Sequence, residues 1–450
     1  MNVAGLFLSA LLITNVTVIS PTQRLTHVSV LIRDGKIAQI GKRVDAPSDA
    51  QRIDGRGKFL IPGLIDSHVH PSNIGPVDAG ALLQAYRAQL PRAFLAFGFT
   101  TLIDLDLQSI TLGWFNAAPL HPTLFHCGPA LRVTGGYGSR LKDPNIADTP
   151  EAVPRAVDRV FEAGGICIKT FIEPGFGGAT HFEVPTRETL DAIRAEATRR
   201  GLVLLIHANA VEAWQPAIAA HADVLAHGLW HWSGDRISIM PPAEAREVIE
   251  GAARRGIAVQ PTVQSVYGDL SIFDPSILND TRLPIALPAS VIAYLKSDEG
   301  QAAARAIQEE YRPIIKKLFG NMDPLAVMSI AVKRDMASLR IMNADGVKLL
   351  FGSDTPANEG IGNPPGLNGR LEISRWAEAG VQLAKILRAA TLDNAVAFHL
   401  NDRGTIEVGK RADLLLLAAD PLKTIAAYDA IETVFLNGQP LPHAALLPRN

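Results

Sequence analysis

A unit of helix, glycine and short apolar strand recurs along the middle of this chain and constrains its fold more than any other feature. In one clear example, Thr186 provides a helix N-cap, apolar residues follow at helical spacing, and Gly201 ends the helix. An apolar run over residues 202–206 then leads to His207. Strands that alternate with helices pair in parallel through right-handed crossovers. The pattern therefore predicts an α/β fold with a parallel sheet.

Each repeat places a polar residue at the end of its predicted strand, which favours a (β/α)8 TIM barrel over an open sheet. Between residues 262 and 346 the chain is longer than one βα connection needs and contains a helical stretch at 300–318. We expect this insertion to form a lid or pocket wall. Comparable units of helix and strand are predicted at residues 149–169, 211–227, 242–260 and 347–354.

Both ends of the chain have β patterns. Asp34-Gly35 suits a tight hairpin turn between apolar runs, and Asn437-Gly438 follows another such run near the other end. The apolar opening stretch, Met1 to Ile19, is also interpreted as strand because it lacks a basic region and a small-residue cleavage site. We predict a small β-sandwich domain built from both termini (1–60 and 402–450) around a barrel at 61–401.

Composition excludes several classes of function. The 450 residues carry a formal net charge of -2 with both signs interspersed, which argues against nucleic acid as a partner. After the opening stretch, no uninterrupted apolar run approaches the ~18 residues of a membrane span. Cys127 and Cys167 lie in separate apolar runs, so we expect no disulfide and a reducing, cytoplasmic compartment. A homo-oligomer acting on a small molecule is expected.

The predicted strand ends carry residues that bind metals. His68 and His70 are two apart on a strand-like run, so both project to the same side. A single histidine in an apolar run is more often structural, but His207, His227 and Asp354 occupy the same rim of the predicted barrel. Imidazole and carboxylate are good ligands for zinc and related divalent ions. The pattern therefore predicts a metal centre.

Lys169 ends another predicted strand at this rim. A lysine that faces a desolvated, metal-rich interior is driven toward its neutral amine, which can add carbon dioxide. The resulting carbamate has two oxygens and can bridge two divalent cations. An ordinary ion pair for Lys169 stays open as the alternative.

Taken together, these segments resemble the amidohydrolase superfamily, in particular its imidazolonepropionase-like and prolidase-like metal-dependent hydrolases. The matching segments are LIPGLIDSHVH, GGICIKT, LLIHANA, VLAHG and LLFGSDTP, and GTIEVGKRADLLLL matches the return to a terminal β-domain. The resemblance implies that His68 and His70 bind one metal, that His207 and His227 bind the other, and that carboxylated Lys169 bridges the two metals. Asp354 would ligate the first metal and act as the catalytic proton shuttle. Zinc is the expected metal.

The implied reaction is hydrolysis of a carbon–nitrogen bond, with a dipeptide or N-acyl amino acid as the leading substrate class and a cyclic amide next. Two alternatives remain at this point. The same centre could cleave an ester, lactone or phosphotriester, because hydroxide between two metals attacks any polarised acyl or phosphoryl centre. From a different class, the chain could be a catalytically silent structural homologue, although none of the six ligands is missing.

Candidate substrate contacts lie in the loops that follow the predicted strands. Tyr137 and Tyr267 could bond a substrate carbonyl oxygen, and Arg132 could receive a substrate carboxylate. Trp230 and His231 follow His227 on the same rim and could line the pocket, although loop aromatics are often plain packing.

Overall fold

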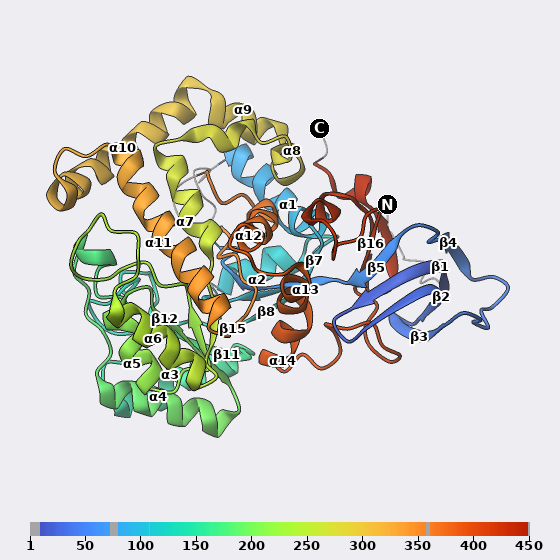
Figure 1. The fold of residues 1–450 in the computed structure, drawn as a ribbon, viewed down its shortest axis with the longest axis horizontal. Coiled ribbons are helices and arrows are strands. Elements are labelled where there is room, and N and C mark those ends of the chain that lie inside the picture. The colour runs from blue at the N-terminus through green and yellow to red at the C-terminus, as the bar shows by residue number, and fades with distance from the viewer. Residues whose placement is uncertain (1–9, 73–79, 108, 357–360, 449–450) are drawn as a thin grey trace.

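The computed structural model describes residues 10–72, 80–107, 109–356 and 361–448. Parallel strands lie in the middle of the larger part, with helices around them, and a separate sheet lies to one side (Figure 1). The blue N-terminal and dark red C-terminal segments meet in that side sheet (Figure 1). The chain therefore has a mixed α/β fold, and strands from its two ends belong to the same sheet.

Eight strands of the larger part belong to two parallel sheets. Three strands follow the order β6-β7-β8 and five follow the order β11-β12-β13-β14-β15. Their order in space is their order in the sequence, as predicted from the repeated unit of helix and strand. The strands are β6 (Leu64–Val69), β7 (Phe99–Asp104), β8 (Thr123–His126), β11 (Cys167–Phe171), β12 (Val203–His207), β13 (Val224–Ala226), β14 (Ala258–Gln260) and β15 (Lys348–Leu349).

Backbone hydrogen bonds connect the two sheets at both edges. Ile166 N donates to His126 O at 2.9 Å, which links the start of β11 to the end of β8. On the other side, Ser67 N donates to Phe351 O at 3.1 Å and Asp354 N to His68 O at 2.7 Å. The ends of β6 and the segment after β15 are therefore neighbours.

Helices connect consecutive strands, and their ends follow the sequence signals. The Thr186 hydroxyl accepts a bond from Thr189 N at the start of α4, and Gly201 ends that helix at a φ of 65°. The described helices outside the long insertion are α1 (Gly80–Ala96), α2 (Ser109–Asn116), α3 (Val153–Glu162), α4 (Arg187–Arg200), α5 (Val211–Ala219), α6 (Ala243–Arg254), α12 (Leu367–Glu378), α13 (Leu383–Arg388) and α14 (Asn394–Ala397).

The insertion between β14 and β15 is helical, and its outer helices project from one end of the molecule (Figure 1). It contains α7 (Val263–Asp269), α8 (Leu283–Ala286), α9 (Ala289–Lys296), α10 (Asp298–Phe319) and α11 (Pro324–Ala344). Only two residues separate the end of β14 from its first helix, α7, so this helix starts next to the strand ends. Its role as a lid stays a prediction.

The two termini form a single eight-stranded sheet with the order β18-β17-β16-β5-β1-β2-β3, and β4 pairs with β1. The Asp34-Gly35 and Asn437-Gly438 turns join the hairpins that the sequence predicts. The predicted second layer of a sandwich stays a prediction. The strands are β1 (Leu11–Ser20), β2 (Gln23–Arg33), β3 (Lys36–Gly41), β4 (Gln51–Asp54), β5 (Phe59–Pro62), β16 (Leu414–Leu417), β17 (Ile431–Leu436) and β18 (Gln439–Pro442).

The strands of the two parallel sheets share an interior apolar cluster that includes Ile65, Ile103, Leu205 and Leu350. Burial of such side chains contributes about 1.5–3 kcal/mol each before entropic costs. Among the described residues, no helix combines the length and apolarity that crossing a bilayer requires.

One expectation from the sequence is wrong. Cys127 and Cys167 form a disulfide inside this interior cluster, with their Cα atoms 4.3 Å apart. Each cysteine lies in an apolar run, as predicted, but β8 and β11 are neighbours and so bring the two sulfurs together. The disulfide also removes the thiol argument for a reducing compartment. The cytoplasmic location therefore stays a prediction without that support.

Candidate metal centre

Strand β6 delivers the first two histidines. His68 is fully buried, and neither of its ring nitrogens has a hydrogen-bond partner among the described residues. Burial lowers the pKa of His68 to about 3, so its imidazole is neutral and retains a free lone pair. His70 directly follows the strand, and its ring centroid lies 5.2 Å from that of His68. Burial opposes protonation of His70, but its hydrogen bond and charge interaction with Asp354 raise its pKa above the usual value. Two imidazoles thus face one region, and burial keeps that of His68 neutral.

Asp354 lies opposite these two histidines. Its Oδ1 is 3.3 Å from His68 Nε2 and 3.2 Å from His70 Nε2. Burial opposes ionisation of this carboxyl, but the neighbouring histidines hold its pKa well below the usual value. One ligand atom from each of the three residues lies within 4.8 Å of the others. Asp354 also has a φ of 57°, a strained backbone of the kind that occurs at functional sites.

His207 and His227 extend the same group of side chains. The ring centroid of His227 lies 4.9 Å from that of His68 and 4.5 Å from that of His207. Burial lowers the pKa of both histidines, so both are neutral donors at pH 7. His227 has a φ of 93°, so two of the candidate ligands have left-handed backbone. The four imidazoles therefore form one continuous row.

Lys169 lies in the middle of β11, not at its end as the sequence predicted, because the strand continues through Thr170 and Phe171, and it is only 1% exposed. Burial lowers its pKa to about 8, far below the ordinary value for a lysine. Its charge acts on each of the other candidate ligands, which places it among them: His68, His70, His207, His227 and Asp354. The structure places His68, His70 and Asp354 in one group and continues it through His227 and His207, and Lys169 lies close enough to act on their charges. Metal binding by these six side chains stays a prediction.

The chemistry of this set fits divalent cations. Four imidazoles, three of them with lowered pKa values, and an ionised carboxylate are ligand types that zinc and related ions accept. His68 Nε2 lies 3.3 Å from Asp354 Oδ1, whereas the buried Nδ1 has no such neighbour among the described residues, and a buried nitrogen of this kind is costly unless a ligand satisfies it.

Three polar residues that sequence reasoning missed orient these side chains. Glu173 Oε2 accepts from His207 Nε2 at 3.0 Å, which leaves Nδ1 free for a ligand. Thr262 Oγ1 is 2.8 Å from His227 Nδ1, which leaves Nε2 free. Ser265 Oγ donates to Asp354 Oδ2 at 3.0 Å. Each of them lies just after a strand or at the start of α7. Polar residues at such positions are the signal by which the sequence could have identified them.

Asp104 lies near the Nδ1 atom of His70, on the side of the ring away from Asp354. It ends β7 with its Oδ1 3.9 Å from His70 Nδ1, and its Oδ2 has no hydrogen-bond partner among the described residues. Burial raises the pKa of Asp104 to about 7. This carboxyl also escaped the sequence analysis, although it ends a strand as the other site residues do.

Three of the predicted substrate contacts lie beside the row of histidines. Tyr137 is half-buried, with its ring centroid 5.5 Å from that of His207. The ring of Trp230 lies 6.0 Å from His227 and 5.9 Å from His231. These three residues therefore border the centre on the side of His207 and His227.

The other two predicted contacts have side-chain partners of their own. Arg132 forms a buried ion pair with Asp106, with 2.6 Å between Nη2 and Oδ2. The Tyr267 ring lies under the guanidinium of Arg375, 3.8 Å from ring centroid to Cζ. Neither residue is placed against the candidate ligands by these contacts.

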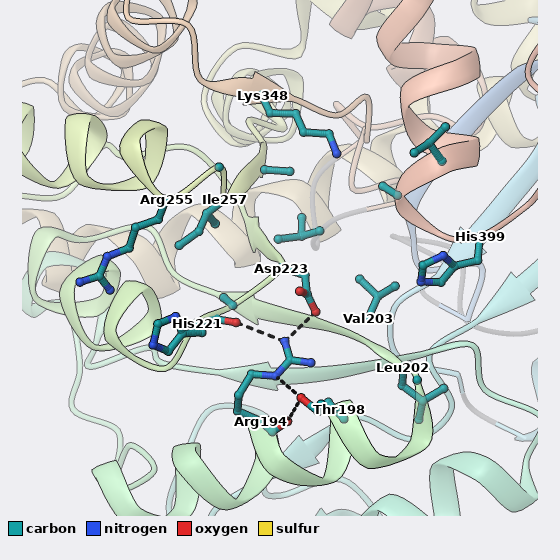
Figure 2. A pocket seen from close by; sticks show the side chains of 18 residues that line it. Arg194, Thr198, Leu202, Val203, His221, Asp223, Arg255, Ile257, Lys348 and His399 are labelled. Carbon is teal, nitrogen blue, oxygen red and sulfur yellow. Dashed lines mark hydrogen bonds and ion pairs between the residues drawn. The ribbon is translucent and has the colours of Figure 1, made fainter.

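A cavity of about 540 Å³ lies at the opposite ends of the strands (Figure 2). Arg194 Nη1 donates there to His221 O at 3.2 Å and to Asp223 Oδ2 at 2.7 Å, and Arg255 Nη1 donates to Ile218 O at 2.9 Å. The two guanidinium groups thus donate hydrogen bonds to carbonyl oxygens at the C-terminal end of α5, where positive charge stabilises a helix. The cavity is therefore separate from the candidate metal centre.

Comparisons with known proteins agree with this architecture. The curated imidazolonepropionase of Micrococcus luteus is 26% identical over 448 residues, covering 96% of each chain. The imidazolonepropionase of Deinococcus radiodurans is 23% identical over 431 residues, covering 93% of this chain and 92% of the relative.

Among solved structures, a Xaa-Pro dipeptidase with bound methionine matches with a TM-score of 0.69 and 22% identity, covering 96% of this chain and all 100% of the other. Ochratoxinase of A. niger matches with a TM-score of 0.68 and 20% identity, covering 96% of each chain. At such identities the structures show likeness of fold. Residues 59–441 match the Amidohydrolase family. The chain therefore belongs to the amidohydrolase family.

Proposed function

We propose that this chain is a hydrolase that holds two divalent metal ions, with zinc as the expected metal, and cleaves an amide carbon–nitrogen bond. The observation that carries the proposal is the gathering of four imidazoles, one ionised carboxylate and a lysine with a lowered pKa in one buried cluster. A dipeptide or N-acyl amino acid is the proposed substrate class. The named hydrolases among the relatives support the reaction type.

The proposed architecture is a barrel of eight parallel strands with the active site at the carboxyl ends. Hydrogen bonds at both edges of the two sheets support closure, through Ile166 and His126 on one side and Asp354 and His68 on the other. In this arrangement residues 61–401 form the catalytic domain, 262–346 its lid-like insertion, and the terminal segments (1–60 and 402–450) an accessory β-domain.

His68 and His70 would hold one ion, His207 and His227 the other, and Lys169 would bridge them as a carbamate. Two bound divalent cations acidify a shared water and polarise a carbonyl oxygen. Carbamate formation joins the neutral Lys169 nitrogen to the carbon of carbon dioxide and releases one proton. The lowered pKa of Lys169 supports this step because it increases the neutral fraction of the amine.

Asp354 would accept the proton from the attacking water and deliver it to the leaving nitrogen. Its ionised form at neutral pH suits it to accept a proton, and Ser265 holds one of its oxygens in place. Tyr137, Trp230 and His231 border the centre and would contact the substrate.

Metal reconstitution tests the proposal. Protein stripped with a chelator and reloaded with zinc should hydrolyse members of a panel of N-acyl amino acids and dipeptides, and the stripped protein should not. A parallel panel of esters and lactones separates amide from ester specificity. A catalytically silent homologue would gain no turnover on either panel.

A matched pair of variants locates the activity. His207→Asn should abolish turnover and lower the bound metal. His399→Asn should leave both unchanged, since His399 is exposed at the opposite end of the strands and asparagine tolerates its φ of 58°. Equal effects of the two substitutions would refute the assignment of the centre.

A further inference from the structure

A group of aromatic side chains lies against the candidate metal centre on its His207 side. The Tyr137 ring centroid is 5.5 Å from that of Phe171, 5.4 Å from that of Phe176 and 5.6 Å from that of Phe182. The same Tyr137 ring lies 5.5 Å from His207. We call Tyr137, Phe171, Phe176 and Phe182 the aromatic cluster. It brings an apolar surface next to a candidate ligand.

The members of the aromatic cluster differ in exposure. Phe171 belongs to β11 and is buried, whereas Tyr137, Phe176 and Phe182 come from loops and are only partly buried. Partly exposed aromatic rings that gather beside a polar site are typical of a surface that receives a ligand. A group that extends from the metal centre past His207 would meet these three rings.

Two of the charged side chains that border the aromatic cluster, Arg132 and Glu173, already have partners, and Lys169, with its Nζ 5.1 Å from the Phe171 ring centroid, belongs to the candidate metal centre. The guanidinium of Arg132 lies 4.7 Å from the Phe171 ring centroid and is paired with Asp106. Glu173 accepts bonds from His207, Asn209 and two backbone amides. A charged substrate group at the aromatic cluster would therefore lose hydration without gaining an unpaired counter-ion from these residues. An uncharged group fits.

The loops that carry these rings are tied together before any ligand binds. Phe176 N donates to Glu173 Oε1 at 2.6 Å, Phe182 N to Pro174 O at 3.2 Å, and Glu183 N to Gly135 O at 3.2 Å. The last bond joins the loop of Phe182 to the loop of Tyr137. A surface fixed in this way loses little entropy when a ligand packs on it.

We propose that the aromatic cluster binds an uncharged aromatic group attached to the scissile amide, so that the enzyme prefers aryl-substituted amides. The inference rests on the proposed function for the reaction itself. It adds the chemistry of one substituent, which offset or edge-to-face packing on Tyr137, Phe176 and Phe182 would recognise.

Binding of two phosphonates to the zinc-loaded enzyme tests the preference without turnover. Benzylphosphonate and methylphosphonate share an anionic head that suits bound cations and differ by one phenyl ring. Isothermal titration should give a dissociation constant at least about tenfold lower for benzylphosphonate, because the ring is removed from water against the aromatic cluster. A ratio near one, or no binding of either compound, overturns the inference.

Substitutions test whether the preference for the phenyl group arises at the aromatic cluster. Phe182→Ala and Phe176→Ala should each lower the ratio to about threefold or less while methylphosphonate binding stays unchanged. Phe161→Ala is the matched control, because Phe161 is 54% exposed and packs against Arg200 on α3 and α4, away from the aromatic cluster. An undiminished ratio in both cluster variants overturns the inference.

Failure of this inference and failure of the proposed function give different results. If amides are hydrolysed but methyl and phenyl substituents are treated alike, the aromatic cluster has no role in recognition and the proposed function stands. If the phosphonates show the phenyl preference and no amide is hydrolysed, the binding surface stands and the reaction does not.

Discussion

Glu173 connects a candidate metal ligand to the substrate side of the site through the two oxygens of one carboxylate. Its Oε2 accepts from His207 Nε2 at 3.0 Å, and its Oε1 accepts from Gly175 N at 2.7 Å and Phe176 N at 2.6 Å. The carboxylate therefore fixes both the orientation of an imidazole and the start of the loop that carries the aromatic rings.

Replacing this carboxylate should weaken metal binding. In Glu173→Gln, an amide N–H can face His207 Nε2, which disfavours the tautomer that keeps Nδ1 free. We expect metal affinity to fall by about 10–100-fold, measured by competition with a chromophoric chelator. Glu183→Gln, at an exposed position, is the control. Unchanged affinity in Glu173→Gln would show that the orientation of His207 does not depend on this residue.

Removing the hydroxyl that holds Asp354 should affect turnover more than substrate binding. Ser265→Ala deletes the bond from Ser265 Oγ to Asp354 Oδ2. We expect kcat to fall about tenfold, which corresponds to about 1.4 kcal/mol, with little change in KM. Steady-state kinetics on one amide checks this, and Ser329→Ala, on the surface of α11, is the control. A rise in KM alone would assign Ser265 to substrate binding instead.

The buried ion pair of Arg132 and Asp106 should contribute to stability. Removing one partner by Arg132→Ala leaves the other charge uncompensated and should lower the free energy of unfolding by about 3–5 kcal/mol. A double-mutant cycle with Asp106→Asn should show that the two losses are less than additive. Denaturant unfolding measures both. If Arg132→Ala instead raised KM at full stability, the residue would be a receptor for a substrate carboxylate.

The disulfide should stabilise the fold strongly. Cys127 and Cys167 are separated by 40 positions, and closing such a loop in the unfolded chain is worth about 4 kcal/mol. Denaturant unfolding of the oxidised protein should therefore require more denaturant than unfolding with a reductant. The double variant Cys127→Ala/Cys167→Ala should no longer respond to the reductant. Two free thiols in the denatured, unreduced protein would contradict the disulfide.

Carboxylation of Lys169 should depend on pH in a recognisable way. The lowered pKa of about 8 means that the amine is mostly neutral above pH 8 and mostly protonated below it. The rate of carbamate formation in metal-free protein, measured at a fixed concentration of dissolved 13C-labelled carbon dioxide, should therefore rise with pH and level off above about 8, rather than near the ordinary lysine value of about 10.4. Carbon-13 NMR detects the carbamate, and Lys169→Met should give no signal.

The sequence allows the six candidate ligands to be predicted because parallel strands end at one edge of a sheet. His207 and His227 each follow a short apolar strand, so their proximity follows from the strand order alone. The position of Asp354 does not follow from strand order alone. Strand β15 has only two residues, and the chain continues beyond it before Asp354 N bonds to His68 O.

The remaining parts of the site depend on contacts between positions far apart in the sequence. Glu173 and His207 are 34 positions apart, Thr262 and His227 are 35 apart, and Ser265 and Asp354 are 89 apart. No local pattern specifies such a pair, because each side chain alone suits a loop or a helix start. The disulfide could not be predicted for the same reason, since β9 (Leu131–Arg132), β10 (Asn145–Ile146) and α3 separate β8 from β11 along the chain.

The terminal sheet has a consequence for the order in which the protein is made. Strand β5 ends at Pro62, yet one of its neighbours, β16, begins at Leu414, so the ribosome translates almost all of the catalytic region before that edge of β5 is covered. During synthesis β5 would present unpaired amides and carbonyls to other nascent chains. We therefore expect the protein to depend on chaperones during expression. We also expect truncations that remove β16 to prevent folding, because β5 would then keep an unpaired edge.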